Sequence, residues 1–157
     1  MTEKIPKVYV LVGVPGSGKS TWIKEQEWAS ECAYISTDIW VEDFAKRMGK
    51  TYSEVFTEYM PTAVKLMADH VVKAREQGQD IIWDQTSTTI ASRKRKFNML
   101  PNYYHIAVVF ETPSRLELNK RLASRPGKEI PDVVIEGMRA SFEMPTEAEG
   151  FDEIWYT

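Results

Sequence analysis

The chain of 157 residues contains a single cysteine, Cys32, so it can form no internal disulfide. That scarcity is typical of proteins from a reducing compartment. Residues 1–7 contain no apolar run of the kind that a signal peptide needs, and no later run approaches the roughly 18 apolar residues of a membrane span. We therefore expect a cytoplasmic protein that makes no membrane contact.

The sequence also lacks an excess of basic residues, since 20 Lys and Arg stand against 23 Asp and Glu. A surface that is basic all over is excluded, whereas a local basic face that binds nucleic acid is not. Basic residues gather at 93–96 and again at Arg121, Arg125 and Lys128. The run at 93–96 either follows nucleic-acid phosphates or forms a solvated helix face.

Segments with strand and helix patterns alternate along the chain, which is typical of a parallel sheet covered by helices on both faces. Strands are predicted over residues 7–12, 33–36, 80–83, 104–110 and 153–156. Helices are predicted over residues 18–27, 38–48, 51–77, 92–100, 113–124 and 131–142. Pro61 predicts a kink or a break into two helices, and Thr112 is the expected cap of the helix that Pro113 opens. No linker divides the chain, so we expect one α/β domain over residues 1–157.

Residues 13–20 read Gly-Val-Pro-Gly-Ser-Gly-Lys-Ser and match G-x-x-x-x-G-K-[ST] at every fixed position. The glycines let the backbone curl so that N–H groups point at phosphate oxygens, and the helix that follows adds its positive dipole end. Lys19 then reaches the β- and γ-phosphates of ATP, and Ser20 ligates Mg²⁺. The expected nucleotide-binding residues are Gly13, Pro15, Gly16, Ser17, Gly18, Lys19, Ser20 and Thr21. A strand before the loop and a helix after it predict a P-loop kinase fold.

Two aspartates directly follow predicted strands, Asp38 after the second and Asp84 after the third. In open α/β sheets, ligands bind outside the carboxyl ends of the strands. Asp38 is therefore predicted to be the general base that takes the proton of an acceptor hydroxyl, although it could also cap the helix that it begins. Asp84 is predicted to support Mg²⁺ or to orient the acceptor, and a capping turn in its own loop is the alternative.

Arg121, Arg125 and Lys128 surround the break at Pro126 and Gly127. Arg121 and Arg125 share one helical face if the helix continues that far. We expect a helical lid that excludes water and supplies cations to the transferred phosphoryl group, with Arg125 as the better arginine finger. Cations that suit the dipole of a helix end are the alternative.

Four pieces of sequence together resemble the kinase domain of phage-type polynucleotide kinase, which phosphorylates 5′-hydroxyl ends of DNA and RNA. The pieces are residues 13–22, 36–38, 84–86 and 120–125. The resemblance implies that Lys19 and Ser20 hold ATP and Mg²⁺ and that Asp38 is the general base. It also implies that Arg121 and Arg125 grip ATP and stabilise the phosphoryl group.

One position departs from the family, in which an arginine three residues after the base helps hold the acceptor phosphate. Here that residue is Val41. Arg47 or the run at 93–96 replaces the arginine, or the acceptor is presented differently. Related phage kinases act on a hydroxymethyl group of a modified pyrimidine in DNA. Trp40 either stacks on such a base or packs in the core.

The sequence therefore predicts ATP-dependent transfer of the γ-phosphate to a hydroxyl of nucleic acid, on a 5′ end or on a hydroxymethylpyrimidine base. The alternatives are a small-molecule kinase acting on a nucleoside, sugar or antibiotic, and an ATP-binding switch with a protein partner. His70 and His105 show no spacing typical of a metal site and are expected to be structural.

Overall fold

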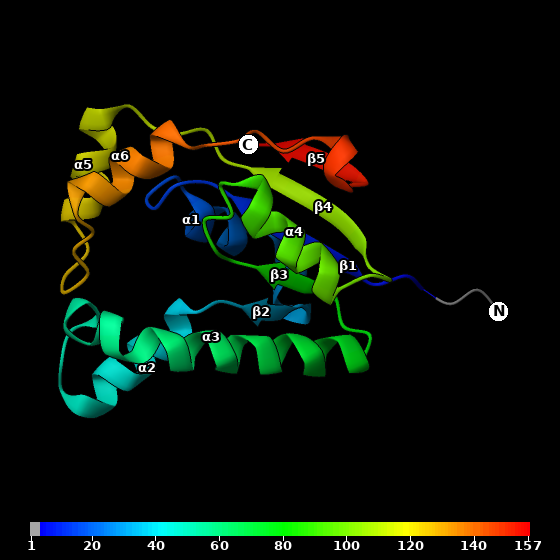
Figure 1. Cartoon of the computed structure of the whole chain (residues 1–157), viewed down its shortest axis with the longest axis horizontal. Helices are drawn as coiled ribbons and strands as arrows, with labels where there is room; N and C mark the ends of the chain where they lie inside the picture. Colours follow the sequence, from blue (N-terminus) through cyan, green and yellow to red (C-terminus); the bar gives the residue numbers. More distant parts are fainter. Residues whose placement is uncertain (1–3) are drawn as a thin grey trace.

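A single parallel sheet forms the centre of the molecule in the computed structural model, which describes residues 4–157 (Figure 1). Residues 1–3 of the expected domain lie outside the described residues. The strands are β1 (Lys7–Val12), β2 (Ala33–Ile35), β3 (Ile81–Trp83), β4 (Tyr104–Val109) and β5 (Glu153–Tyr156). They pair in parallel throughout, in the order β2-β3-β1-β4-β5. The predicted sheet of about five parallel strands is confirmed.

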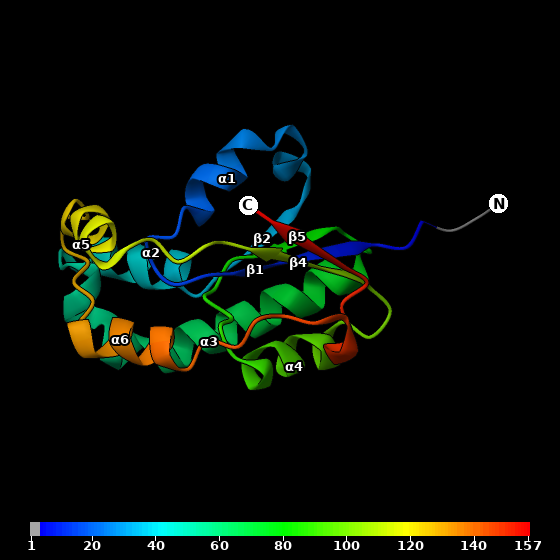
Figure 2. The same ribbon diagram turned by 90° about the horizontal axis from the view of Figure 1, so that it is seen from above.

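Helices cover both faces of the sheet (Figure 2). The helix α1 lies on one face, α3 and α4 lie on the other, and α2, α5 and α6 gather near the carboxyl ends of the strands. Their bounds are α1 (Lys19–Glu25), α2 (Asp38–Met48), α3 (Tyr52–Glu76), α4 (Ile90–Met99), α5 (Arg115–Ala123) and α6 (Asp132–Ala140). Two short 3₁₀ helices, η1 (Glu27–Glu31) and η2 (Glu147–Glu149), complete the order.

The central strand β1 is buried on both faces, which explains its unbroken apolar sequence. Alternate residues point to opposite sides of a strand, so Val8 and Val10 pack in the layer beneath α3 and α4. Tyr9 and Leu11 pack in the layer on the α1 side, where the Tyr9 ring lies 4.4 Å from that of Trp28. Two apolar layers therefore fix the sheet and leave the carboxyl ends of its strands for the site.

The longest helix, α3, runs unbroken through Pro61, so of the two alternatives predicted there, a kink or a break, the break into two helices is wrong. Proline deprives the carbonyl of Thr57 of its helical donor, but both residues are exposed and water can satisfy that carbonyl. The predicted start is confirmed, because Thr51 and Glu54 form a reciprocal capping box. The predicted cap of α5 is also wrong, since Ser114 rather than Thr112 caps that helix.

The basic run at 93–96, predicted either to follow nucleic-acid phosphates or to form a solvated helix face, is half buried and half exposed. Arg93 and Lys96, one helical turn apart on α4, are 0% and 6% exposed, so they cannot follow nucleic-acid phosphates. Only the intervening Lys94 and Arg95 are exposed. The Lys96 ammonium lies 5.2 Å from the centre of the Trp83 ring, and burial lowers the pKa of Lys96 to about 8.

The two histidines pack within the fold, as predicted. His105 is buried with its ring Nε2 2.8 Å from the carbonyl oxygen of Leu100, and His70 meets the edge of Trp40. Across residues 4–157, no group of three or more His, Cys, Asp or Glu side chains is placed to hold a metal ion. No helix in that range is both long enough and apolar enough to cross a membrane.

Candidate active site

The phosphate loop, residues 13–20, follows β1 and leads into α1. Gly16 and Gly18 have φ angles of +81° and +103°, in the region that favours glycine. Gly13 needs its missing side chain for a different reason. A Cβ there would lie 2.5 Å from Oγ of Ser17 and 2.9 Å from Cβ of Phe110. The loop is therefore tightly wound, as phosphate binding by backbone N–H groups requires.

Lys19 closes the loop by curling back over it. Its ammonium group donates to the carbonyl oxygens of Gly13 and Val14 at 2.8 and 3.1 Å. The pKa of Lys19 is lowered to about 8, mainly by burial; the negative charge of Asp84 opposes this shift, and the positive charge of Arg125 contributes to it. An anionic ligand would stabilise the protonated ammonium.

The donors of the loop fit a phosphate group. Oγ of Ser17 is buried and makes no hydrogen bond to the described residues. A phosphate oxygen could accept from this hydroxyl and from the Lys19 ammonium. The loop thus has the donors, the winding and the charge that the nucleotide phosphates require.

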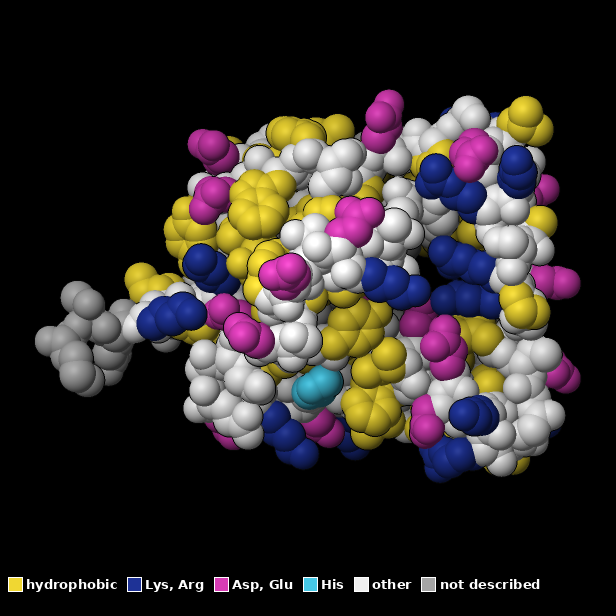
Figure 3. Space-filling model, turned by 180° about the vertical axis from the view of Figure 1, so that it is seen from behind, with side chains coloured by type: hydrophobic (Ala, Val, Ile, Leu, Met, Phe, Trp, Pro, Cys, Tyr) yellow, Lys and Arg dark blue, Asp and Glu magenta, His cyan; other side chains and the backbone are white. Residues whose placement is uncertain are grey.

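A cleft of about 2630 Å³ opens beside the loop and extends to the beginnings of α2 and α3. Figure 3 shows Lys and Arg side chains gathered around a hollow on one side of the molecule. Gly13 lies buried beneath the loop, whereas the other predicted site residues line the cleft. They are Pro15, Gly16, Ser17, Gly18, Lys19, Ser20, Thr21, Asp38, Asp84, Arg121 and Arg125.

Asp38 is the first residue of α2, and Thr37 takes the N-cap position that Asp38 could have occupied. The carboxylate is held at both oxygens. Oδ1 accepts a hydrogen bond from the Tyr52 hydroxyl at 2.7 Å, and Oδ2 accepts one from the Lys128 ammonium at 2.8 Å. Burial, followed by the negative charge of Asp38, raises the pKa of Tyr52, so its hydroxyl remains a donor.

Lys128 is a site residue that the sequence suggested only as part of a basic group. Its ammonium lies 4.5 Å from the centre of the Tyr52 ring and 3.8 Å from Glu42, in addition to its bond with Asp38. Tyr52 gave no sequence signal, because a tyrosine that opens a helix is most simply a packing residue. Only the approach of the loop after α5 to α3 brings these groups together.

Asp84 follows β3, which pairs with β1, so its side chain reaches the cleft beside the phosphate loop. The Tyr34 hydroxyl donates to Oδ2 of Asp84. Burial raises the pKa of the Asp84 carboxyl, against the Tyr34 hydrogen bond and the charge of Lys19, which lower it. A cation beside Asp84 would favour its ionised form. Because Ser20 lines the same cleft, the two oxygen ligands suit a hydrated Mg²⁺.

The two predicted lid arginines both line the cleft but lie on different elements. Arg121 belongs to α5 and donates to the carbonyl oxygen of Gly16 at 2.9 Å and to Glu117 at 2.9 Å. The helix ends at Ala123, so Arg125 lies in the loop and the condition for one shared helical face is not met. The structure nevertheless brings both arginines to the phosphate loop.

The lid, which comprises α5 and residues 124–130, is docked across the cleft on the beginning of α3. The Ser53 amide donates to the Gly127 carbonyl at 3.1 Å, and the Glu129 amide donates to Oγ of Ser53 at 2.8 Å. A Cβ on Gly127 would lie 3.1 Å from Cβ of Thr51, so the two segments are in close contact. This docking places Lys128 on Asp38.

The residues expected to replace the family arginine do not reach the cleft. Val41 is fully buried between α2 and α3, and Arg47 pairs with Asp43 at 3.1 Å outside the cleft. On the side of the cleft formed by α2, the cations that line it are Lys46 and Lys50. Trp40 packs against the two core clusters that flank α2 and does not line the cleft, so its predicted packing role is confirmed.

Comparisons with known proteins agree with this arrangement. A family model described as an AAA domain matches residues 8–145. The chain is 27% identical over 160 residues to the bifunctional polynucleotide phosphatase/kinase of Schizosaccharomyces pombe, and the match covers 94% of this chain and 32% of that protein. The chain thus spans about a third of the length of the curated relatives it matches.

Solved structures share the fold. A chain in the structure of the Pnkp1/Rnl/Hen1 RNA repair complex has a TM-score of 0.65 at 25% identity, covering 89% of this chain and 45% of that one. Shikimate kinase from Bacteroides thetaiotaomicron has a TM-score of 0.51 at 19% identity, covering 96% of this chain and 86% of that one. The second likeness shows the P-loop kinase fold alone.

Proposed function

Because the chain belongs to the AAA domain family, we propose that it is a phosphotransferase that moves the γ-phosphate of ATP onto a hydroxyl group of nucleic acid. One observation carries the proposal. A wound phosphate loop and a carboxylate held by two donors line the same cleft. A switch needs the loop but has no use for an acceptor base, so the pair favours group transfer.

The nucleotide end of the reaction uses the phosphate loop. The backbone N–H groups and Lys19 bind the phosphates, and Arg121 and Arg125 approach them from the lid. Mg²⁺, held by Ser20 and supported by Asp84, would neutralise charge on the β- and γ-phosphates. The lid excludes water, which limits wasteful hydrolysis of ATP.

The acceptor end uses Asp38. An acceptor hydroxyl donates its proton to the carboxylate while its oxygen forms a bond to the γ-phosphorus, and the bond from that phosphorus to the β–γ bridging oxygen breaks to release ADP. Tyr52 and Lys128 orient the carboxylate for this step. Arg125 stabilises the charge of the transferred phosphoryl group.

Nucleic acid is the proposed acceptor for two reasons. The S. pombe relative is named as a polynucleotide phosphatase/kinase, and the RNA repair complex contains a similar chain. Lys46 and Lys50 also line the cleft on the side of α2, where they can contact acceptor phosphates. We propose a 5′-hydroxyl end rather than a flipped base, because Trp40 is packed in the core.

A direct test measures transfer of labelled γ-phosphate to matched oligonucleotides. One carries a free 5′-hydroxyl, one is blocked at the 5′ end, and one is blocked but contains hydroxymethylpyrimidine. Label on the first alone is the expected result. Label on the third alone would make the protein a kinase of modified bases. If none of them is labelled although the protein binds ATP, the alternative of a small-molecule kinase is favoured. Shikimate kinase has the same fold as this chain.

The role of Asp38 has its own test. Replacing it by asparagine, Asp38→Asn, keeps the shape but removes the proton acceptor, so the transfer rate should fall by about 10²–10⁴-fold while ATP binding stays nearly intact. Asp43→Asn, on the exposed side of the same helix, is the matched control. A rate near that of the wild type in Asp38→Asn would remove the residue from the mechanism.

A further inference from the structure

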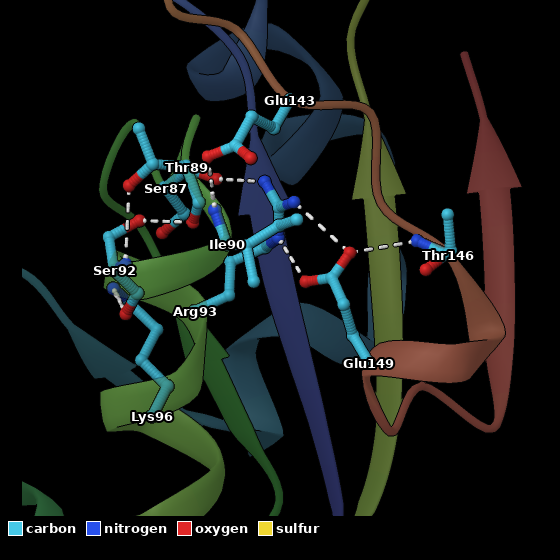
Figure 4. Close-up of polar contacts among 9 residues, drawn as sticks. All are labelled: Ser87, Thr89, Ile90, Ser92, Arg93, Lys96, Glu143, Thr146 and Glu149. Carbon is cyan, nitrogen blue, oxygen red and sulfur yellow. Dashed lines mark hydrogen bonds and ion pairs between the residues drawn. The ribbon is translucent and has the colours of Figure 1, made fainter.

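Arg93 takes no part in the mechanism above, yet its side chain is 0% exposed and lies behind the wall of the cleft. Its guanidinium donates to both carboxylate oxygens of Glu149, at 2.8 and 3.1 Å, and to the carbonyl oxygen of Ser87 at 2.9 Å (Figure 4). Glu149 in turn accepts from the Thr146 amide at 2.9 Å. The pair joins α4, η2 and the loop after β3.

Stability alone is a weak explanation for this arrangement. The side chains of Arg93 and Glu149 are 0% and 7% exposed. Taking two charges out of water carries a desolvation penalty that often offsets their attraction, and apolar residues of similar volume frequently stabilise a protein as well or better. What a bidentate guanidinium supplies, and apolar packing does not, is a fixed direction for each hydrogen bond.

The hydrogen bond that Arg93 directs away from Glu149 goes to the backbone of Ser87. This residue has a φ of +46°, the single positive value among non-glycine residues in the described part of the chain, and it is 3% exposed. A serine in this region is strained and stays there only because its surroundings hold it, and such strain clusters at functional sites. The hydrogen bond from Arg93 to the Ser87 carbonyl fixes the peptide plane that follows this residue.

The strained residue closes the loop that carries Asp84. Residues 84–86 line the cleft, whereas Ser87 and Arg93 lie behind its wall. The carbonyl of Thr86, next to Ser87, accepts a hydrogen bond from the amide of Gly13 at 2.9 Å. A rotation at Ser87 would therefore displace the Thr86 carbonyl, which anchors the first residue of the phosphate loop and lies two residues from Asp84.

The C-terminal segment holds the same loop from a second point. The Glu143 amide donates to the carbonyl of Thr88 at 2.8 Å. The Glu143 carboxylate accepts from the amide of Ile90 at 3.1 Å (Figure 4). Residues 143–149 thus cover the loop without reaching the cleft. Segments more than 50 residues apart in sequence are joined here by two acidic side chains.

We propose that the Arg93–Glu149 pair is a positioning clamp, which acts through Ser87 to hold Asp84 and the phosphate loop at the spacing that Mg²⁺-bound ATP requires. The inference rests on the proposed function for the role of Asp84. The arrangement of the loop itself does not depend on that function, so the clamp can also be tested on the protein without nucleotide.

The test compares Arg93→Lys with two controls. Arg93→Lys keeps the charge but loses the fork, so it cannot hold Glu149 and Ser87 together. Val71→Ala removes buried apolar volume beneath the sheet and lowers stability without touching the loop. Arg95→Lys makes the same chemical change at an exposed position of α4. Thermal unfolding shows how far each variant is destabilised, and Glu149→Gln serves as the second clamp variant if Arg93→Lys does not fold.

Two measurements are made on the folded variants: amide hydrogen exchange of residues 84–89 and 13–18 without nucleotide, and the Kd for ATP with and without Mg²⁺. We expect faster exchange in both segments and about 10- to 100-fold weaker Mg²⁺-dependent binding in Arg93→Lys, as for other groups that orient metal ligands. Arg95→Lys should leave the exchange rates and the Kd unchanged, and Val71→Ala should speed exchange only as far as its lower stability requires, with an unchanged Kd. Equal effects of Arg93→Lys and Val71→Ala at matched stability would overturn the clamp. Failure of the wild type to bind ATP would refute the proposed function, while the exchange data would still decide the clamp.

Discussion

Replacing Lys128 by methionine, Lys128→Met, tests the contact on which the acceptor end of the site depends. The substitution keeps most of the aliphatic stem but removes the ammonium that lies 2.8 Å from Oδ2 of Asp38 and 4.5 Å from the centre of the Tyr52 ring. The hydroxyl of Tyr52 remains as the second donor to the carboxylate. The change therefore loosens the base without removing it.

The expected magnitude follows from the exposure of the pair. Hydrogen bonds to charged groups contribute about 1.5–3 kcal/mol, but the Asp38 side chain is 44% exposed and water screens part of this interaction. We therefore assign about 1–2 kcal/mol to the orientation that Lys128 gives Asp38. If that free energy is lost from the transition state, kcat falls by about 5- to 30-fold.

Steady-state transfer to the 5′-hydroxyl oligonucleotide measures the effect. We expect kcat to fall while the KM for ATP stays within about twofold, because an interaction used in the transfer step lowers kcat rather than nucleotide binding. Lys120→Met, on the exposed face of the same lid, should behave like the wild type. An unchanged kcat in Lys128→Met, or a loss seen only in the KM for ATP, would refute the reasoning.

Two further predictions test the winding of the phosphate loop and the charge of the buried Lys96. Gly13→Ala places a Cβ 2.5 Å from Oγ of Ser17 and 2.9 Å from Cβ of Phe110. We therefore expect calorimetry to show that ATP binding is lost, while circular dichroism shows a folded chain. Tight ATP binding by this variant would mean that the phosphate loop can adopt another winding. Lys96, whose pKa burial lowers from 10.5 to about 8, gives the second test. Between these values the unfolded chain binds a proton that the folded chain has lost, so stability rises with pH by about 3 kcal/mol. Denaturant unfolding from pH 7.5 to 10.5 should show this rise in the wild type relative to Lys96→Met, and parallel curves for the two proteins would contradict it.

Local sequence was enough to predict where the phosphate loop lies and how it is wound. Glycine spacing fixes the winding of residues 13–20, and a strand before it with a helix after it fixes where that loop lies in a parallel sheet. The same rule placed Asp38 and Asp84 at the carboxyl edge, and both line the cleft. These predictions hold because they depend on residues close in sequence and on a general property of open sheets.

Side-chain burial on a helix was harder to predict. Four cations in a row at 93–96 suggested an exposed face, either solvated or in contact with nucleic-acid phosphates. Arg93 is instead buried, and its charge is paired with Glu149, 56 residues away. The sequence showed that Val41 stands in place of the family arginine. It did not show that Lys46 and Lys50 line the cleft, because that follows from how α2 packs against α3. No pattern within either helix contains that information.

The sequence by itself determined the fold class, the phosphate loop and the two carboxylates that end strands, since backbone conformation and sheet topology follow from local patterns. Tertiary structure alone decided which groups hold those carboxylates. Lys128 and Asp38 are 90 residues apart, and they meet because the lid docks on the beginning of α3 through Ser53 and Gly127. A hydrogen bond depends on a few tenths of an ångström between atoms, and for distant residues that spacing is set by the packing of whole elements.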